Sequence, residues 1–308
     1  MTKKLYLPVF LLLALSMVLS ACTSPSIEPP IPTKKKTNGA SSLPVLADAQ
    51  ALFTELITGM PADKGYGSVE PDAFSKELTA KPPFLLDVRI ASELKNDGFI
   101  KGSVQIPIRD ILQNLDKLPG LDEPIVVICA TGHRSGMVTA ALRLLGYTNV
   151  RNLNGGIDAW KKAALPVLTG SQPAKPTIIS KPVITDQALY DSLNVFFTDL
   201  PDGFYSLKPE KLNENLSANY PPRLIDVRTK AEWDKNGHIE GSINIPFSDF
   251  FANLDQVSDK EAHYVIVDDT GHRGSILTLV LRIMGYTHVS NLNGGLNDWI
   301  AAKLPVVK

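Results

Sequence analysis

The residues best suited to chemistry lie around Cys129. An apolar run, Val126–Ile128, ends on this cysteine, and a short loop and a helix-like apolar pattern follow it. The loop consists of Ala130, Thr131, Gly132, His133, Arg134 and Ser135. This order predicts a buried parallel strand, a tight turn and a helix whose first backbone N–H groups face the thiol. Because those N–H groups and the helix dipole stabilise negative charge, the arrangement favours a thiolate in an anion-binding loop.

An alternative interpretation is that Cys129 is a small buried hydrophobe at the end of a strand. Two neighbours argue against it. Gly132 tolerates a positive φ in the turn, and Arg134 lies where a curled loop could aim its guanidinium at the same anion. We therefore expect Cys129 to be a reactive nucleophile.

Composition limits the other functions of the chain. With 308 residues, it is long enough for two domains of ordinary size. A formal net charge of -1 shows no electrostatic footprint for nucleic acid. The only cysteines are Cys22 and Cys129, and the five histidines show no ligand spacing. We therefore expect no disulfide framework and no metal site.

The N-terminal segment has the pattern of a targeting signal. Two lysines precede an apolar run, Leu5–Leu19, which is too short for a comfortable membrane span. The ending Leu19-Ser20-Ala21-Cys22 resembles a bacterial lipobox, which implies a signal peptide over 1–21, cleavage before Cys22 and a lipid on its sulfur. The chain would then be anchored to a membrane outside the bacterial cytoplasm. An ordinary secretory signal, with Cys22 incidental, is the alternative.

A tether rich in Pro, Ser, Thr and Lys is expected over 22–48, because nothing in it can build a core. Its run of three lysines could touch anionic lipid headgroups, although a solvated linker is the simpler interpretation.

From residue 49 onward the chain repeats itself. The motifs that recur 139 residues later are Asp87-Val88-Arg89, Thr131-Gly132-His133-Arg134, Gly146-Tyr147-Thr148, Asn152-Leu153-Asn154-Gly155-Gly156 and Trp160. This offset indicates duplication of a whole domain rather than a small solenoid unit. We expect domain 1 over 49–168, a proline-containing linker over 169–186 and domain 2 over 187–308.

Strand and helix signals alternate within each copy. In domain 1 the expected strands are Phe84–Val88, Ser103–Ile106, Ile125–Cys129 and Val150–Leu153, and the expected helices are Pro71–Thr79, Asp110–Leu115, Ser135–Leu145 and Ile157–Ala163. Alternation of this kind predicts an α/β fold, a mostly parallel sheet with helices on both faces. Ligands then bind at the carboxyl ends of the strands, where Cys129 is expected to lie.

With these residues in view, the chain resembles a tandem of two rhodanese domains. The motifs that carry the resemblance are Asp87-Val88-Arg89 with Glu93, Gly98–Ser103, the loop Cys129–Ser135, Leu144–Tyr147, Leu153–Gly156 and Trp160. Phe99 departs from the family pattern, which usually has His there; the second copy has His238 at that position. We expect this departure to change local packing rather than chemistry.

The resemblance implies sulfur transfer, as in thiosulfate sulfurtransferases. Cys129 would take a sulfane sulfur from thiosulfate or a similar donor and pass it from a persulfide to a thiol or cyanide. The backbone N–H groups of residues 130–135 would hold the anionic sulfur, and Arg134 the sulfonate oxygens. Asp87 and Arg89 would support the loop from a neighbouring strand end. No metal or organic cofactor is needed.

The second copy differs at the key position. Asp268 replaces the cysteine, and a carboxylate cannot carry a persulfide, so domain 2 is expected to be inactive. Asp268 either fills its own loop from within, against backbone N–H groups and Arg273, or is turned to solvent after simple decay. His133 could bear on the choice of substrate or acceptor. The alternative that we favour is a polar loop side chain, because the residue recurs as His272 in the copy without the thiol.

Two rival functions remain. A protein or arsenate phosphatase uses a related loop, but with five residues between Cys and Arg, where this chain has four. A non-enzymatic sulfur carrier or binding module at the cell surface is the second rival, because domain 2 already lacks the nucleophile.

Overall fold

Strand β4 (Ile125–Ile128) is the central element of the first domain and carries the cysteine at its carboxyl end. The structure is a computed structural model, and it describes residues 49–171, 173–181 and 183–308. All four residues of β4 are buried, because the strand lies between two neighbours and under helices on both faces. The predicted buried strand before Cys129 is confirmed.

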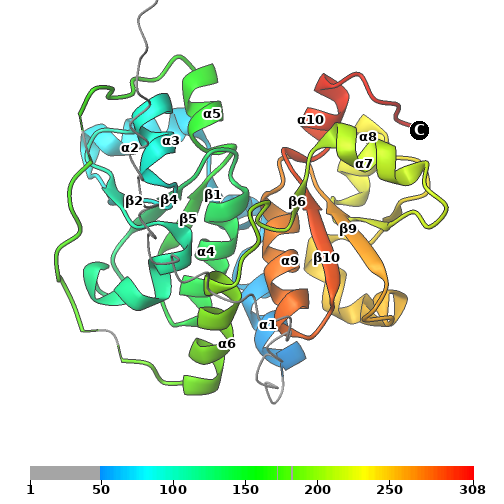
Figure 1. Ribbon diagram of the computed structural model, residues 1–308, viewed down its shortest axis with the longest axis horizontal. Helices are drawn as coiled ribbons and strands as arrows, with labels where there is room; N and C mark the ends of the chain where they lie inside the picture. Colours follow the sequence, from blue (N-terminus) through cyan, green and yellow to red (C-terminus); the bar gives the residue numbers. More distant parts are fainter. Residues whose placement is uncertain (1–48, 172, 182) are drawn as a thin grey trace, which may run out of the picture. The chain divides into compact units, whose positions relative to one another are not determined.

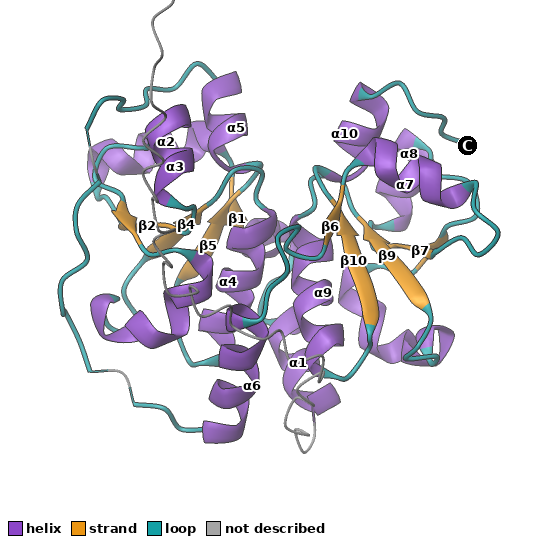
Figure 2. Ribbon diagram, viewed as in Figure 1, coloured by secondary structure: helices purple, strands orange, loops and turns teal. Residues whose placement is uncertain are grey.

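The first domain is a five-stranded parallel sheet (Figures 1 and 2). In spatial order the strands are β1 (Ser68–Val69), β5 (Val150–Leu153), β4, β2 (Phe84–Asp87) and β3 (Val104–Gln105). The helices are α1 (Ala49–Thr58), η1 (Ala62–Gly67), α2 (Pro71–Ala80), α3 (Ala91–Asp97), η2 (Ile108–Lys117), α4 (His133–Leu144) and α5 (Gly156–Lys162), where η marks a 3₁₀ helix.

The second domain repeats this topology, again with every strand pair parallel. Its strands, in spatial order, are β6 (Ser206–Leu207), β10 (His288–Leu292), β9 (His263–Val267), β7 (Arg223–Asp226) and β8 (Ile243–Asn244). Its helices are α6 (Gln187–Thr198), α7 (Pro209–Leu216), α8 (Lys230–Asn236), η3 (Phe247–Val257), α9 (His272–Ile283) and α10 (Gly295–Ala301). The expected fold class, two α/β domains with helices on both faces of a parallel sheet, is therefore confirmed.

Alternation along β4 divides the core of domain 1. Val126 and Ile128 face Phe74 of α2 and Trp160 of α5, whereas Ile125 and Val127 face the side covered by α4 and η2. This is the two-residue period of a strand with both faces buried. Domain 2 has an equivalent private core around Trp299.

The other core is shared by the two domains. Helix α4 packs against α9, α1 against η3, and α6 against η2, and one continuous hydrophobic cluster joins them. The rings of Phe53 and Phe251 lie 6.3 Å apart across this core. A Cβ atom at Gly136 of α4 would lie only 2.2 Å from the Ser275 hydroxyl of α9, so the close helix approach requires glycine there. All described residues fall in a single compact unit.

Some expected elements differ in kind or extent. Asp110–Leu115 was expected to be an ordinary helix, but it lies within η2, whose 3₁₀ turns are interrupted where Asn114 leaves helical geometry. The expected helices over 71–79, 135–145 and 157–163 are present with ends shifted by one or two residues. Helices α1 and α3 were not anticipated.

The predicted signal peptide (1–21), Cys22 and the tether (22–48) lie outside the described residues. Within residues 49–171, 173–181 and 183–308, we find no helix that is both long enough and apolar enough to cross a membrane.

Candidate active site

Cys129 directly follows β4, in the loop that leads into α4. Its side chain is fully buried, and its Sγ accepts a hydrogen bond from the Gly132 backbone N–H at 3.1 Å. Gly132 adopts the left-handed conformation (φ 91°), and this conformation turns its N–H toward the sulfur. The loop therefore has the expected form, with a backbone donor on the sulfur at the start of a helix.

A glycine turn after β5 supports this loop from behind. The N–H groups of Ile157 and Asp158 donate to the Cys129 and Ala130 carbonyls at 2.8 and 3.0 Å. A Cβ atom at Gly156 would lie 2.5 Å from both carbonyl oxygens, so only glycine permits the contact. This explains why the Gly-Gly motif accompanies the cysteine loop.

Ser135 adds a side-chain hydroxyl to the sulfur. Its Oγ lies 3.2 Å from Cys129 Sγ and also hydrogen-bonds the Asn152 amide oxygen. All three side chains are fully buried. Cys129 therefore belongs to a buried polar group of three residues, of which Asn152 was not anticipated.

Arg134, expected to face a bound anion, is paired with a carboxylate. Its Nη1 donates to Glu93 at 2.8 Å, and Nη2 bonds the other Glu93 oxygen. Burial alone would raise the pKa of Glu93, but the bonds and charge of Arg134 outweigh it and lower that pKa below its usual range. Arg134 thus stands beside the thiol as an ion pair rather than as a free cation.

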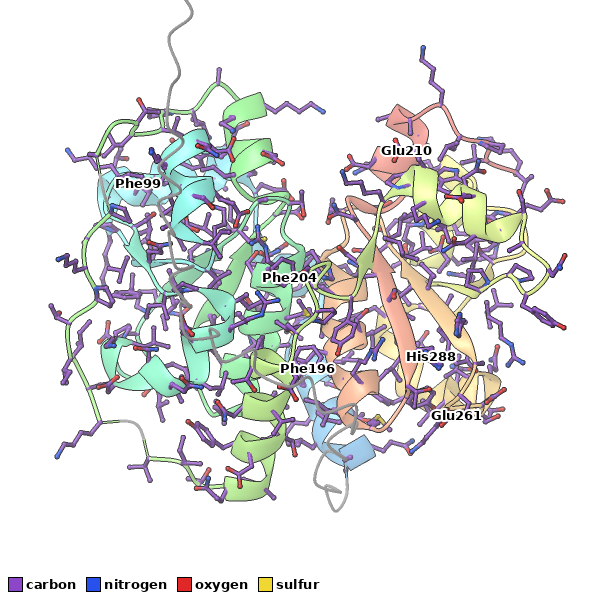
Figure 3. All side chains as sticks on the ribbon, viewed as in Figure 1. Phe99, Phe196, Phe204, Glu210, Glu261 and His288 are labelled. Carbon is purple, nitrogen blue, oxygen red and sulfur yellow. The ribbon has the colours of Figure 1, made fainter. Side chains whose placement is uncertain are left out.

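A pocket of about 410 Å³ lies beside the loop and is lined by both domains. The loop contributes Ala130, Thr131, His133 and Arg134; domain 2 contributes Asp202, Phe204 and Asn293. The Phe204 ring lies 4.9 Å from the Arg134 guanidinium carbon and 5.2 Å from that of Arg109. Phe204 is labelled in Figure 3. Domain 2 therefore forms one side of the pocket beside the cysteine loop of domain 1.

His133 corrects the sequence-based interpretation. It is the first residue of α4, is 3% exposed, and binds domain 2 through both ring nitrogens. Nε2 bonds the Phe204 carbonyl at 2.6 Å, and Nδ1 bonds the Asn291 amide nitrogen at 2.8 Å. Burial lowers the pKa of His133 to about 4. His133 is an interdomain contact rather than a solvated loop side chain.

The other loop residues are placed as follows. The Thr131 hydroxyl bonds the Asn293 amide oxygen of domain 2 at 2.8 Å. Asp87 and Arg89 form a fully buried ion pair at 2.6 Å, and Arg89 also donates to the Gly98 carbonyl. Asp87 thus ends β2 beside β4 and holds Arg89, and it is the Arg89 guanidinium that binds the backbone at Gly98.

The corresponding site in domain 2 is occupied by its own carboxylate. Asp268 is 1% exposed, accepts from the Gly271 and Arg273 backbone N–H groups at 2.8 and 3.0 Å, and lies 3.7 Å from the Arg273 guanidinium. Burial raises the pKa of Asp268 despite these partners. Of the two arrangements expected for Asp268, the structure shows the one that fills the loop from within.

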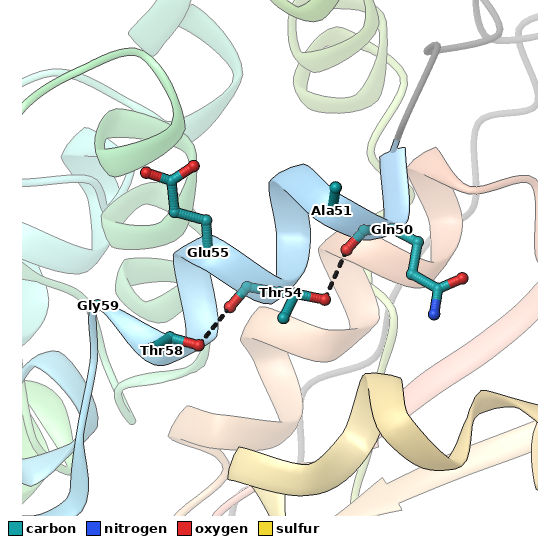
Figure 4. Close-up of a pocket in the computed structure, with 6 residues that line it drawn as sticks. All are labelled: Gln50, Ala51, Thr54, Glu55, Thr58 and Gly59. Atoms are coloured by element: carbon teal, nitrogen blue, oxygen red, sulfur yellow. Dashed lines mark hydrogen bonds between the residues drawn. The ribbon is translucent and has the colours of Figure 1, made fainter.

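A second hollow, of about 880 Å³, runs along α1 and is lined by residues 50–59 (Figure 4). The Thr54 and Thr58 hydroxyls donate to carbonyls one turn back in the same helix. Glu55 is the only ionisable side chain among the residues that line it. The hollow lacks a nucleophile. No group of three or more His, Cys, Asp or Glu side chains in the described part of the chain is arranged to hold a metal ion.

In the described residues, fold and site together define a tandem α/β protein with a buried cysteine in a loop between a parallel strand and a helix. The family model described as "Rhodanese-like domain" matches residues 70–163 and 208–302, more than half of the chain. The chain therefore belongs to the rhodanese-like domain family.

The relatives are individual domains or parts of other proteins. A protein named "Sulfurtransferase" from Allochromatium vinosum is 32% identical over 101 residues, which cover 32% of this chain and 92% of that protein. "Protein HIGH ARSENIC CONTENT 1, mitochondrial" from Arabidopsis thaliana is 34% identical over 91 residues, 26% of this chain. That match spans about half (53%) of the Arabidopsis protein.

Among solved structures, the chain is similar to a thiosulfate sulfurtransferase from Pseudomonas aeruginosa. The two share 24% identity with a TM-score of 0.37, over 80% of this chain and 46% of that one.

Proposed function

We propose that this protein is a sulfurtransferase that carries a sulfane sulfur as a Cys129 persulfide. The observation that supports it most is the Gly132 N–H on Cys129 Sγ, in a loop that opens a helix. Such a loop stabilises a negative sulfur, whether thiolate or persulfide. The names of the sulfurtransferase relatives agree with this chemistry.

The reaction proceeds through two displacements. The Cys129 thiolate attacks the outer sulfur of thiosulfate; the S–S bond of thiosulfate breaks, and its electron pair leaves with sulfite. A thiolate or cyanide then attacks the outer sulfur of the persulfide, takes it as a new persulfide or as thiocyanate, and regenerates the Cys129 thiolate. Charge balances in each step, and no cofactor takes part.

Arg134 binds the sulfonate end of the donor in this proposal, because it is the guanidinium nearest the loop. Glu93 holds it in place until the donor arrives. In domain 2, Asp268 cannot accept a sulfur, and its carboxylate fills the position that an anion would need. Domain 2 is therefore proposed to be inactive in sulfur transfer.

The proposed location is outside the bacterial cytoplasm, with the chain anchored through a lipid on Cys22. The support is the Leu19-Ser20-Ala21-Cys22 ending after an apolar run. A Cys22→Ser chain should lose membrane association in cell fractionation; retention of both chains in the membrane fraction would remove this proposal.

Intact-mass spectrometry tests the persulfide directly. After incubation with thiosulfate, the wild-type chain should gain the mass of one sulfur, about 32 Da, and the Cys129→Ser chain should gain none. Because Cys22 is present in both chains, the comparison isolates Cys129. Absence of the gain, with a thiol that can still be alkylated after unfolding, would contradict the proposal.

A non-enzymatic sulfur carrier is the second candidate, and the complete burial of Cys129 favours it. Turnover separates the two functions. An enzyme releases many equivalents of sulfite when thiosulfate and a thiol acceptor are supplied together, whereas a carrier loads once and stops.

A further inference from the structure

A chain of hydrogen bonds connects the nucleophile of domain 1 to a histidine of domain 2. Cys129 Sγ lies 3.2 Å from Ser135 Oγ, which bonds the Asn152 amide oxygen. The Asn152 amide nitrogen lies 3.0 Å from His272 Nδ1, and His272 Nε2 lies 2.8 Å from the Tyr66 carbonyl oxygen. His272 thus sits between two groups of domain 1.

The direction of every hydrogen bond in this series follows from the last acceptor, the Tyr66 carbonyl oxygen. A carbonyl oxygen only accepts, so His272 Nε2 carries the proton that it donates to Tyr66. Burial lowers the pKa of His272 to about 4, so the ring is neutral and its Nδ1 is a bare acceptor. The Asn152 group facing Nδ1 must then be its NH₂, which leaves the amide oxygen facing Ser135.

Ser135 has one proton to give. Ser135 Oγ is within donor range of both Cys129 Sγ and the Asn152 amide oxygen, and it lies closer to the amide oxygen. Because that amide oxygen only accepts, we assign the proton to Asn152 at rest, and the serine oxygen then faces the cysteine with lone pairs. A protonated Cys129 can donate to these lone pairs. An ionised Cys129 gains a donor only if the serine proton leaves Asn152, which leaves a buried amide oxygen unsatisfied.

Comparison with domain 2 shows which of these hydrogen-bonding residues occur only together with the cysteine. There, Asn291 bonds His133 at 2.8 Å, as Asn152 bonds His272. Gly274 replaces the serine, Asp268 replaces the cysteine, and the Asn291 amide oxygen has no hydrogen-bond partner in the described structure. The hydroxyl that would connect the amide to the nucleophile is present only in the domain that has the nucleophile.

The backbone at Tyr66, which accepts the hydrogen bond from His272, has an uncommon conformation. Tyr66 has a left-handed conformation (φ 54°), which is unusual and strained for a residue with a side chain. Its ring stacks 4.6 Å from the Arg273 guanidinium carbon, and its carbonyl meets His272, the residue before Arg273. Both contacts hold domain 2 against domain 1 at this point.

We infer that His272 of the inactive domain is a positioning residue for Cys129, acting through Asn152 and Ser135 to keep the serine proton away from the sulfur at rest. The inference rests on Cys129 being the nucleophile of the proposed sulfur transfer. Domain 2 thereby governs how readily the thiol of domain 1 ionises.

The charged groups around this chain are few. Arg134, paired with Glu93, faces Cys129, and Arg273 and Arg143 act on His272. Arg273 is itself paired with Glu232, Asp268 and Asp269. Burial raises the pKa of Asp269 to about 6, and this residue is unchanged in every variant compared. None of these arginines changes charge near neutral pH. A change in the ionisation of Cys129 on substitution of His272 therefore reports the hydrogen-bond chain.

The test follows thiolate formation by its ultraviolet absorbance against pH, each variant being read against the same variant with Cys129→Ser. This measurement needs neither a sulfur donor nor turnover, so it can fail independently of the proposed function. His272→Leu removes the acceptor for Asn152, lets the amide turn its NH₂ toward Ser135, and frees the serine proton for the sulfur. The ionisation midpoint should fall by about one pH unit, the effect of one hydrogen bond to a charged group.

Three further variants make the result specific. His272→Asn keeps an acceptor near the position of Nδ1 and should restore the wild-type midpoint. Thr270→Val removes another bond between the domains, from the Thr270 hydroxyl to the Asn154 amide oxygen at 2.9 Å, and should leave the midpoint unchanged. In a Ser135→Ala background, His272→Leu should have no effect, because the chain is already cut.

The inference is overturned if His272→Leu leaves the midpoint in place, if Thr270→Val shifts it equally, or if the shift persists in the Ser135→Ala background. Should His272→Leu fail to fold, Asn152→Ala provides the same test, because it also frees the serine proton and must lower the midpoint.

Discussion

Acidification from pH 7 to pH 5 should destabilise this protein through His133 and His272. Burial lowers the pKa of each histidine from 6.5 to about 4. Between those values the unfolded chain binds a proton on each histidine, whereas the folded chain does not. The histidine contribution to stability is therefore fully present above about pH 6.5 and is lost as the pH falls toward 4.

The magnitude follows from the two pKa values. At pH 5 protonation stabilises each histidine of the unfolded chain by about 2 kcal/mol relative to the folded chain, in which the ring stays neutral. The two histidines together therefore lower the free energy of unfolding by about 4 kcal/mol. Asp269 acts in the opposite direction, because burial raises its pKa to about 6 and the folded state binds its proton more tightly than the unfolded state. The informative quantity is therefore the difference between wild type and histidine variants, in which Asp269 cancels.

Urea unfolding followed by tryptophan fluorescence, at pH 7 and at pH 5, measures this difference. The control is His133→Asn combined with His272→Asn, which keeps an acceptor at each site but cannot titrate. Wild type should lose about 4 kcal/mol more than the double variant over this interval, and each single variant about half of that. Equal losses in wild type and double variant would refute the burial of neutral histidines between the domains.

Two other substitutions test the sites themselves. Asp268→Ala should lower the unfolding free energy at pH 7 by about 1–3 kcal/mol, because two buried N–H groups lose their acceptor; unchanged stability in urea would show that the carboxylate does not hold its loop. Phe204→Ala should speed alkylation of Cys129 by iodoacetamide about fivefold, since a cation–π contact of about 1 kcal/mol that closes the site is lost. Tyr220→Ala removes an aromatic ring that is 92% exposed and should leave that rate unchanged; equal effects of both variants would mean that Phe204 does not specifically shield Cys129.

The sequence predicted the sheet better than its surroundings. Buried strands such as Phe84–Asp87 and Ile125–Ile128 are continuous apolar runs, and their alternation with helices predicts a parallel sheet. Helix α1 was missed because the surface that it packs on belongs partly to η3 of the other copy. A pattern within one copy carries no signal for a partner far away along the chain. The hydrogen bond from Gln50 to the Phe251 carbonyl, for example, joins residues that are 201 positions apart.

The sequence predicts the residues of the cysteine loop, but not the side chains of other elements that contact this loop. Cys129 and the loop after it could be found from the strand–turn–helix pattern, but the pairing of Arg134 with Glu93 could not, since these residues lie 41 positions apart. Recurrence of His133 as His272 was a usable signal that was misinterpreted. From the sequence, the recurrence argues against a specific role for His133, whereas in the structure each histidine forms a hydrogen bond with the other domain.

Hydrogen bonds that each domain makes with the other explain why domain 2, which has no cysteine, still matters to the site around Cys129. Thr131 bonds Asn293 and Thr270 bonds Asn154; His133 meets the Phe204 carbonyl and His272 the Tyr66 carbonyl. An isolated domain 1 would leave these polar groups without partners and would expose the apolar face of α4, which is buried against α9. The cysteine-to-aspartate difference removes the nucleophile from domain 2 but leaves every one of these contacts in place. The absence of the cysteine from domain 2 is therefore compatible with a continuing requirement for that domain, because it still supplies Phe204 beside Arg134, its part of the shared core and the histidine beside Asn152.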